Sequence, residues 1–170
     1  DRLDYTKGIP ERLMAIDRML MEHPELRGRF AFVQVGVPSR SKLESYASIE
    51  REIDNLVEDI NRRHADESGQ GPIRYRKAAL KIRRLTALYQ LAEFCIVSSL
   101  HDGMNLVAKE FVASRSDERG VLVLSEMTGA AQELTDALII NPYDIDGFAA
   151  AIYRAIQMSP EEQRRRMRAM

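Results

Sequence analysis

The sequence contains few of the residues that cross-link proteins or bind metals. It has one cysteine and no tryptophan in 170 residues, so an intrachain disulfide is excluded. Cys95 lies inside an apolar run, which predicts an unreactive buried thiol rather than a nucleophile. Three histidines, at 23, 64 and 101, are too far apart for metal-ligand spacing. The sequence therefore predicts neither a disulfide framework nor a metal site.

The sequence also lacks an excess of charge and any long apolar run. Its 25 basic and 26 acidic residues give a net charge of -1, which provides no general attraction to nucleic acid or membranes. No stretch has the length of a membrane span, and no signal peptide is recognisable. We therefore expect a cytoplasmic protein. The sequence starts at Asp1 and stops inside a basic helical run, so we expect a piece of a longer protein.

What the sequence does have is a regular alternation of helical and strand patterns, with 45% hydrophobic residues. Helical spacing predicts helices at 10–23, 41–64, 80–92, 129–134 and 145–158. A further helix is predicted from the turn at 102–105 to about 114, and a last one begins at 159–160. Short apolar runs predict strands at 30–35, 73–75, 94–98, 120–124 and 138–140. Strands that are apolar on both faces are typical of parallel sheets with right-handed crossovers. We predict a single α/β domain over 1–170 with a doubly wound, Rossmann-like parallel sheet.

The segment from Asp102 to Glu110 has the strongest functional signal. It follows the predicted strand at 94–98 and leads into a helix, so its turn lies at the carboxyl edge of the sheet, where ligands bind in such folds. Unpaired N–H groups at the helix start attract a phosphate or a developing anion. A carboxylate accepts paired hydrogen bonds from neighbouring hydroxyls. This pattern predicts a nucleotide-sugar site with one carboxylate at each end.

Two further segments place cations at the same edge. Arg2 and Lys7 surround a turn that ends in glycine just before the first predicted helix. Arginine offers a planar fork for a diphosphate and lysine adds a point charge, so together with the amides of Leu106 and Val107 they predict a pyrophosphate clamp. Arg40 follows the first predicted strand, where it can hold a second anionic substrate.

Each of these segments also has a structural interpretation. Asp102 can cap the helix, Gly103 can make the turn, and Glu110 can be a solvated helix residue. The turn around Arg2 can be an ordinary polar turn, and Arg40 an ordinary surface residue. The basic runs at 74–84 and 164–168 indicate solvated faces rather than a nucleic-acid site, because they lack interleaved aromatics beyond one tyrosine.

The order of the motifs resembles one protein family. The strings are DRLDYTKGIPERL at 1–13, GVPSR at 36–40, DGMNLVAKEFVA at 102–113, GVLVLSEMTGAAQEL at 120–134 and NPYDID at 141–146. In these strings the chain resembles the C-terminal, donor-binding half of the trehalose-6-phosphate synthase family of retaining glycosyltransferases. The resemblance implies the C-terminal domain of a two-domain GT-B glycosyltransferase, with the missing N-terminal acceptor domain as its partner.

The resemblance also implies substrates and residue roles. The donor would be UDP-glucose and the acceptor glucose 6-phosphate, and transfer with retention would give trehalose 6-phosphate without a metal or other cofactor. Arg2 and Lys7 would hold the diphosphate and Asp102 the glucose hydroxyls, and these three would be the catalytic residues. Glu110 would bind the ribose, and Arg40 the acceptor phosphate. The rest of the donor site would be the segment between the two carboxylates, namely Gly103, Met104, Asn105, Leu106 and Val107.

Two positions depart from the family pattern. The segment 76–81, where uracil would lie against 78–80, lacks the aromatic or histidine of some members, and His101 stands where many members have arginine. Acceptor choice depends largely on the missing half. A glucosylglycerol-phosphate synthase using glycerol 3-phosphate and a non-catalytic regulatory paralogue therefore remain alternatives, and a homo-oligomer stays open. We expect the chain alone to be inactive, because half a cleft cannot align two substrates.

Overall fold

The structure, a computed structural model, describes residues 1–38 and 44–170, and the side chains of all of these except 44–46. Its helices are α1 (Ile9–Glu22), α2 (Glu44–Arg63), α3 (Ile82–Leu91), α4 (Leu106–Ser114), α5 (Ile145–Gln157) and α6 (Pro160–Ala169). Short 3-10 helices are η1 (Tyr5–Lys7), η2 (Pro24–Leu26) and η3 (Gly129–Gln132). The strands are β1 (Phe32–Gly36), β2 (Ile73–Lys77), β3 (Phe94–Val97), β4 (Val121–Ser125) and β5 (Leu138–Ile140).

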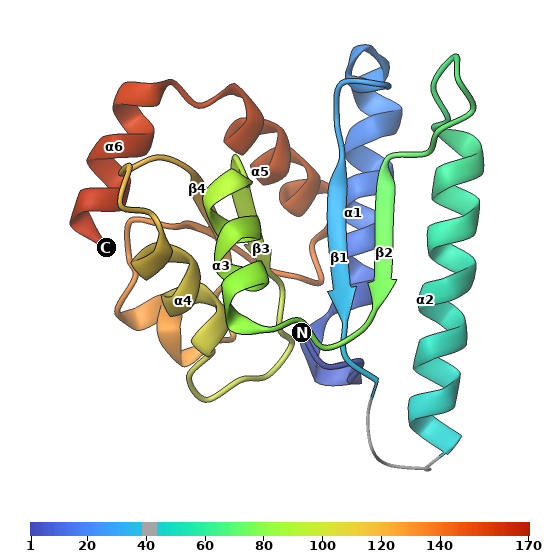
Figure 1. Cartoon of the computed structure of the whole chain (residues 1–170), viewed down its shortest axis with the longest axis horizontal. Coiled ribbons are helices and arrows are strands. Elements are labelled where there is room, and N and C mark those ends of the chain that lie inside the picture. The colour runs from blue at the N-terminus through green and yellow to red at the C-terminus, as the bar shows by residue number, and fades with distance from the viewer. Residues whose placement is uncertain (39–43) are drawn as a thin grey trace.

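The prediction of parallel strands with flanking helices is confirmed, since every pairing between named strands is parallel. The described strands form two sheets, of order β1-β2 and β3-β4-β5, rather than one continuous sheet. The amino-terminal segment lies between the two sheets (Figure 1). Its Arg2 pairs with Val37 beyond the end of β1, and the Leu100 N–H beyond β3 donates to the Thr6 carbonyl at 2.7 Å. This segment therefore links both sheets at their carboxyl edge.

Helices cover both faces of the larger sheet. On one face, Val123 of β4 belongs to a core that includes Phe148 of α5 and the buried side of α1. On the other face, Leu122 and Leu124 belong to a second core with Phe111 of α4. β4 is buried along its whole length because its alternate side chains enter the two cores. This arrangement is the doubly wound one that the sequence predicts.

The smaller sheet shares the first core. Phe32 of β1 and Ile73 of β2 belong to the same buried cluster as the larger sheet, and the Phe30 ring stacks on Phe94 with centroids 6.1 Å apart. α2 lies beside β2 (Figure 1). There Asn61 accepts from the Ile73 N–H at 2.7 Å and donates to its carbonyl at 3.0 Å. The edge of this sheet is therefore partly covered.

Differences from the predicted elements are small. The second predicted strand extends to Lys77, and the helix predicted at 129–134 is the shorter 3-10 turn η3. Side chains cap two of the helices: Asp144 accepts from the Gly147 N–H at 3.0 Å at the start of α5, and Ser159 accepts from the Glu162 N–H at 3.3 Å at the start of α6. No helix in the two described ranges is long and apolar enough to cross a membrane.

Candidate functional site

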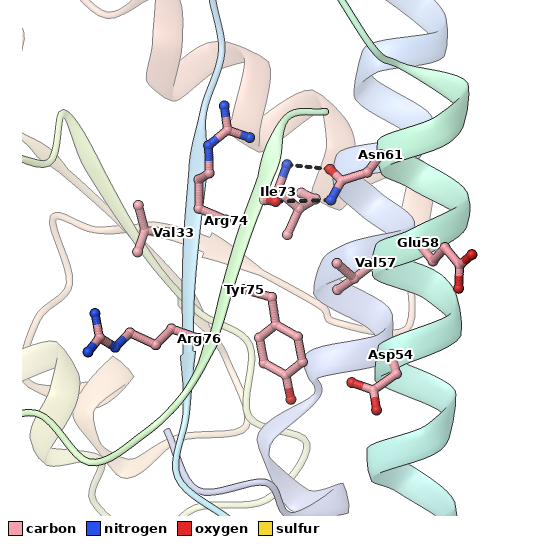
Figure 2. A pocket seen from close by; sticks show the side chains of 9 residues that line it. All are labelled: Val33, Asp54, Val57, Glu58, Asn61, Ile73, Arg74, Tyr75 and Arg76. Atoms are coloured by element: carbon pink, nitrogen blue, oxygen red, sulfur yellow. Dashed lines mark hydrogen bonds between the residues drawn. The ribbon is translucent and has the colours of Figure 1, made fainter. Parts of the chain in front are cut away.

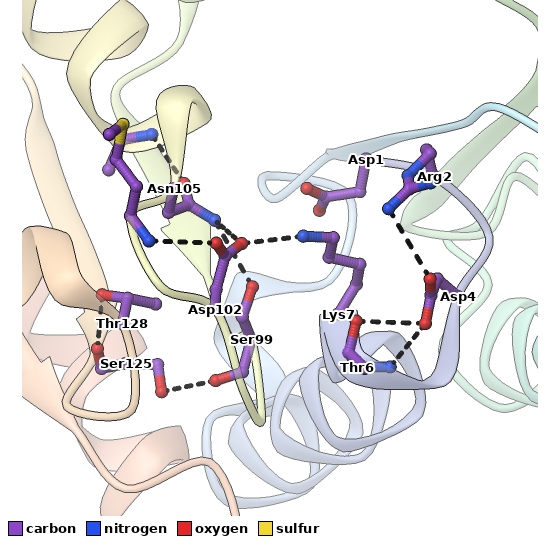
Figure 3. A network of polar contacts seen from close by, with 12 residues as sticks. Asp1, Arg2, Asp4, Thr6, Lys7, Ser99, Asp102, Asn105, Ser125 and Thr128 are labelled. Atoms are coloured by element: carbon purple, nitrogen blue, oxygen red, sulfur yellow. Dashed lines mark hydrogen bonds and ion pairs between the residues drawn. The ribbon is translucent and has the colours of Figure 1, made fainter.

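Lys7 and Asp102 are 95 positions apart in the sequence and meet at the carboxyl edge of the sheets. Lys7 Nζ lies 2.7 Å from Asp102 Oδ2, and each side chain is 17% exposed (Figure 3). Lys7 ends η1 just before α1, while Asp102 lies in the loop after β3. The parallel fold brings both loops to one edge, so it joins two residues that the sequence marked separately.

Asp102 is held as an anion. Burial raises the pKa of its carboxyl, but the hydrogen bonds from Lys7 and from the Met104 N–H outweigh burial and leave the pKa below its ordinary value. Oδ1 accepts from the Met104 N–H at 3.3 Å, and Oδ2 also accepts from Asn105 Nδ2 at 3.1 Å. The carboxylate is therefore ionised at neutral pH and fixed in orientation.

Asn105, rather than Asp102, is the N-cap of α4. Its Oδ1 accepts from the Ala108 N–H at 3.0 Å, while its Nδ2 donates to Asp102. The backbone of Asn105 has φ 76°, a left-handed conformation that asparagine adopts more readily than most residues. The interpretation of Asp102 as a helix cap is therefore wrong, because its oxygens are occupied by Lys7, Asn105 and the Met104 amide.

The turn that carries Lys7 is tightly built. Asp4 caps η1 by accepting from the Thr6 N–H and hydroxyl, both at 3.0 Å. Gly8 follows with φ 59°, and a Cβ there would lie 2.0 Å from the carbonyl oxygen of Ser98. We call residues 4–8 the Lys7 turn. Because only glycine fits this close contact, the turn rests directly on the end of β3.

Arg2 is exposed, and Arg40 lies outside the described residues. The Arg2 side chain is 70% exposed and its guanidinium lies 3.8 Å from Asp4 (Figure 3). Its backbone is fixed by the pairing with Val37. Arg2 therefore stands at the predicted edge with a guanidinium that can turn toward a ligand.

Glu110 lies on α4, half-buried, and faces α3. Tyr89 Oη donates to Glu110 Oε2 at 3.4 Å, and the Tyr89 ring meets Phe111 edge to face at 6.1 Å. The end of α3 is fixed by Arg115, whose Nη1 donates to the carbonyls of Tyr89, Gln90 and Ala92 at 2.6–2.9 Å. The sequence predicted neither contact, because both depend on how α3 packs on α4.

The other predicted donor-site residues form the turn before α4 and its first residues. Met104 and Leu106 are 52% and 61% exposed, and the amides of Leu106 and Val107 are the first two of α4, which have no intrahelical acceptor. The loop after β4 packs against this turn, since a Cβ on Gly129 would come 2.1 Å from the Gly103 carbonyl oxygen. The edge therefore offers free N–H donors beside exposed apolar side chains.

Arg12 is a buried residue next to the site that the sequence interpretation missed. It is 4% exposed and belongs to α1. Its Nε donates to Ser98 Oγ at 3.0 Å, Nη1 to Gln34 Oε1 at 2.9 Å, and Nη2 to Asp1 Oδ2 at 2.9 Å. Burial lowers the pKa of this guanidinium to about 10, so it stays charged at neutral pH.

Two hollows in the described part of the chain lie away from these residues. The larger, about 590 Å³, lies between α2 and β2 and is lined by residues such as Asp54, Asn61 and Tyr75 (Figure 2). The other, about 380 Å³, lies beside β5 and α5. None of the predicted site residues lines either hollow. Both hollows are therefore separate from the predicted site.

Within the described ranges, no three His, Cys, Asp or Glu side chains gather where they could hold a metal ion. The chemistry that this edge can support is binding and charge stabilisation. A lysine, an exposed arginine and free helix amides favour an anion, and two carboxylates favour hydroxyl groups. The arrangement suits a phosphate-bearing sugar derivative.

The chain matches the family model described as Glycosyltransferase family 20 over residues 1–170. The bifunctional trehalose-6-phosphate synthase/phosphatase of Thermoproteus tenax is 52% identical over 170 residues, which is 100% of this chain and 23% of that protein. The UDP-forming alpha,alpha-trehalose-phosphate synthase of Botryotinia fuckeliana is 45% identical over 163 residues, 96% of this chain and 31% of that protein.

Two solved structures are similar over nearly the whole chain. A UDP-forming alpha,alpha-trehalose-phosphate synthase of Burkholderia xenovorans, in complex with glucose-6-phosphate, has a TM-score of 0.96 at 43% identity and covers 100% of this chain. An E. coli structure bound with UDP-2-fluoro glucose has a TM-score of 0.96 at 39% identity and covers 99% of it. This chain spans 38% of each of those two structures. The chain belongs to glycosyltransferase family 20.

Proposed function

We propose that this chain is the donor-binding part of an enzyme that transfers glucose from UDP-glucose to glucose 6-phosphate, giving trehalose 6-phosphate. The observation that supports this most directly is the contact between Lys7 and Asp102 at 2.7 Å. It places a cation suited to a diphosphate beside a carboxylate suited to sugar hydroxyls. The similar structures bound to glucose-6-phosphate and to UDP-2-fluoro glucose support the same pair of substrates.

In this proposal the site residues divide the donor between them. Lys7 and Arg2 hold the diphosphate with the amides of Leu106 and Val107, Asp102 accepts hydrogen bonds from the glucose hydroxyls, and Glu110 accepts them from the ribose. The positive groups stabilise the negative charge that develops on the leaving diphosphate. Arg40 holds the acceptor phosphate, and the remainder of the whole protein supplies the rest of the acceptor site and closes the cleft.

We further propose that transfer retains the anomeric configuration and needs no metal. Asp102 already accepts three hydrogen bonds, which makes it a poor nucleophile and a weak base. The acceptor hydroxyl therefore bonds to the anomeric carbon on the face from which the diphosphate leaves, the bond from that carbon to the diphosphate breaks, and the hydroxyl proton passes to a diphosphate oxygen. With the whole protein, the coupling constant of the new anomeric proton in the NMR spectrum reports the configuration. Activity that persists in EDTA supports the metal-free route, and activity restored only by a divalent cation contradicts it.

Calorimetric titration of the 170-residue chain with UDP tests the donor site, with ADP and inorganic phosphate as controls. We expect UDP to bind selectively and Glu110→Ala to weaken it about tenfold, because the ribose loses a carboxylate acceptor. Glu67→Ala, an exposed glutamate in the loop between α2 and β2, is the matched control and should bind as the parent does. A folded chain that binds ADP as well as UDP would contradict the proposed donor.

The acceptor is tested with the whole protein, because this chain lacks that half of the cleft. We expect trehalose 6-phosphate to form from glucose 6-phosphate, with little product from glycerol 3-phosphate. The opposite preference would indicate a glucosylglycerol-phosphate synthase. A whole protein that binds UDP but transfers glucose to neither acceptor would indicate a regulatory paralogue.

A further inference from the structure

Arg12 occupies a position where the helical pattern calls for an apolar residue. In α1 the positions Ile9, Leu13 and Ile16 form the stripe that enters the core, and each is fully buried. Arg12 lies on the same stripe, three positions after Ile9 and four before Ile16. A guanidinium at such a position loses its hydration, so it is tolerated only where nearly all its N–H groups have partners.

The partners of Arg12 come from three separate parts of the fold. Gln34 lies on β1, Ser98 directly follows β3, and Asp1 lies in the amino-terminal segment between the sheets. A fourth bond runs from Nη2 to the carbonyl of Lys7 at 3.4 Å. The Arg12 side chain therefore connects both sheets to the start of the chain and to the backbone of Lys7.

Ser98 extends this connection to the Lys7 turn. Its Oγ accepts from Arg12 Nε and donates to the Gly8 carbonyl at 2.7 Å, with the Lys7 carbonyl at 3.2 Å. Ser98 is fully buried. The backbone on both sides of the Lys7 side chain is thus held by Arg12, directly or through one hydroxyl.

Stability alone is a poor explanation for this arrangement. Replacing a buried ion pair with well-packed apolar side chains is often neutral or stabilising, so an arginine in a core adds little that a leucine would not. What the planar fork of arginine does offer is several bonds of fixed direction, which an apolar residue or a lysine cannot reproduce. Its value here lies in geometry.

We propose that Arg12 is a positioning residue of the donor site, which sets the place of the Lys7 turn and thereby the Lys7–Asp102 contact without touching the donor. The effect of Arg12 on donor binding rests on the proposed function, in which Lys7 binds the diphosphate. The effect of Arg12 on the position of Lys7 does not, and it can be tested without any ligand.

The first measurement is the pKa of the Asp102 carboxyl in the ligand-free chain, followed by carbon-detected NMR and assigned with Asp102→Asn. In Arg12→Lys we expect this pKa to rise toward its ordinary value, because the Lys7 ammonium no longer lies against the carboxylate. Ser98→Ala should raise it less. Arg18→Lys is the matched control, since Arg18 lies on the same helix but pairs with Glu22 and Asp146 at the surface.

The second measurement is the ratio of UDP to UMP affinity, which isolates the second phosphate. Arg12→Lys should lower this ratio about tenfold, and Arg18→Lys should leave it unchanged. If Arg12→Lys does not fold, Ser98→Ala decides both measurements. An unchanged Asp102 pKa in folded variants would overturn the positioning role even if UDP binds. A raised pKa in a chain that never binds UDP would uphold it and contradict the proposed function instead.

Discussion

The four side chains expected to bind the donor form two pairs that the fold holds very differently. Lys7 and Asp102, the anchored pair, lie 2.7 Å apart and are each 17% exposed. Arg2 and Glu110, the open pair, have looser partners: Arg2 is 70% exposed, and Glu110 accepts one hydrogen bond, from Tyr89 at 3.4 Å. Half of the site is therefore built before a ligand arrives, and the other half is free to adjust to it.

The physical reason lies in what stands behind each pair. The anchored pair rests on buried polar groups at the ends of both sheets, so its geometry is fixed by folding. The open pair belongs to an exposed segment and to a helix face, where side chains keep rotamer freedom. Groups fixed in advance lose little entropy on binding, whereas mobile groups lose more. The comparison predicts large structural effects at the first pair and mainly ligand-dependent effects at the second.

Breaking the anchor should have the largest effect, and Gly8→Ala is the most direct way. The new Cβ meets the Ser98 carbonyl oxygen at 2.0 Å and also forces alanine to φ 59°. We expect the free energy of unfolding to fall by about 3 kcal/mol or more, from left-handed strain plus backbone displacement. Urea unfolding followed by circular dichroism measures this change.

Gly69→Ala separates the two causes. Gly69 also has positive φ, 79°, but no atom lies within 4 Å of its would-be Cβ. It should lose only about 1 kcal/mol, the cost of the left-handed conformation. Equal losses at both glycines would mean that the close contact with Ser98 adds nothing to the stability of the Lys7 turn.

A smaller effect, on UDP affinity, should distinguish the two cations. Lys7→Met should weaken UDP binding about tenfold at low salt and still several-fold at about 0.5 M salt, because a half-buried charge is poorly screened. Arg2→Met should weaken it about threefold at low salt and hardly at all at high salt, as expected of an exposed charge. Calorimetric titration at both salt concentrations gives the comparison. If Arg2→Met is the more damaging variant at high salt, the division into anchored and open pairs is wrong.

The position of Lys7 and Asp102 at one edge was predictable from sequence, but their contact and the residues that support it were not. Lys7 precedes the first predicted helix, and Asp102 follows the strand predicted at 94–98. Parallel topology brings both loops to one edge of the sheet. Arg12 stayed hidden because an arginine in a helix is normally a surface residue. The available signal was its place on the apolar stripe between Ile9, Leu13 and Ile16. Such a position predicts burial, but only the fold can supply Gln34 and Ser98 as its partners.

Other differences have the same origin in long-range packing. Asp102 is a possible helix cap by its sequence position, yet Asn105 makes the cap, because the Asp102 carboxylate accepts from Lys7 instead. The sequence predicts one sheet, whereas the described strands form two. Which strands are hydrogen-bonded neighbours depends on their order across the sheet, which periodicity does not encode. The alternation of helical and strand patterns predicted the class of fold and placed the elements to within a few residues. The contacts between elements depend on packing between segments far apart in the sequence, which local patterns do not encode.

The smallest expected effect concerns the open pair and the one hydrogen bond of Glu110. Tyr89→Phe removes only the hydroxyl, and the ring keeps its edge contact with Phe111. Because the bond is long, at 3.4 Å, the free energy of unfolding should fall by less than about 1 kcal/mol. If Tyr89 orients Glu110 toward the ribose, the ratio of UDP to 2′-deoxy-UDP affinity should fall about twofold to threefold.

A double-mutant cycle completes the test. In the Glu110→Ala background the change at Tyr89 should have no further effect on that ratio, because the carboxylate it acts through is gone. An equal effect in both backgrounds would mean that Tyr89 acts on UDP by another path. If Tyr89→Phe alone changed this ratio about tenfold, as much as Lys7→Met is expected to change UDP affinity, Glu110 would belong with the anchored residues. A small effect confined to the background with Glu110 is what distinguishes a side chain that adjusts to its ligand from one that the fold has already placed.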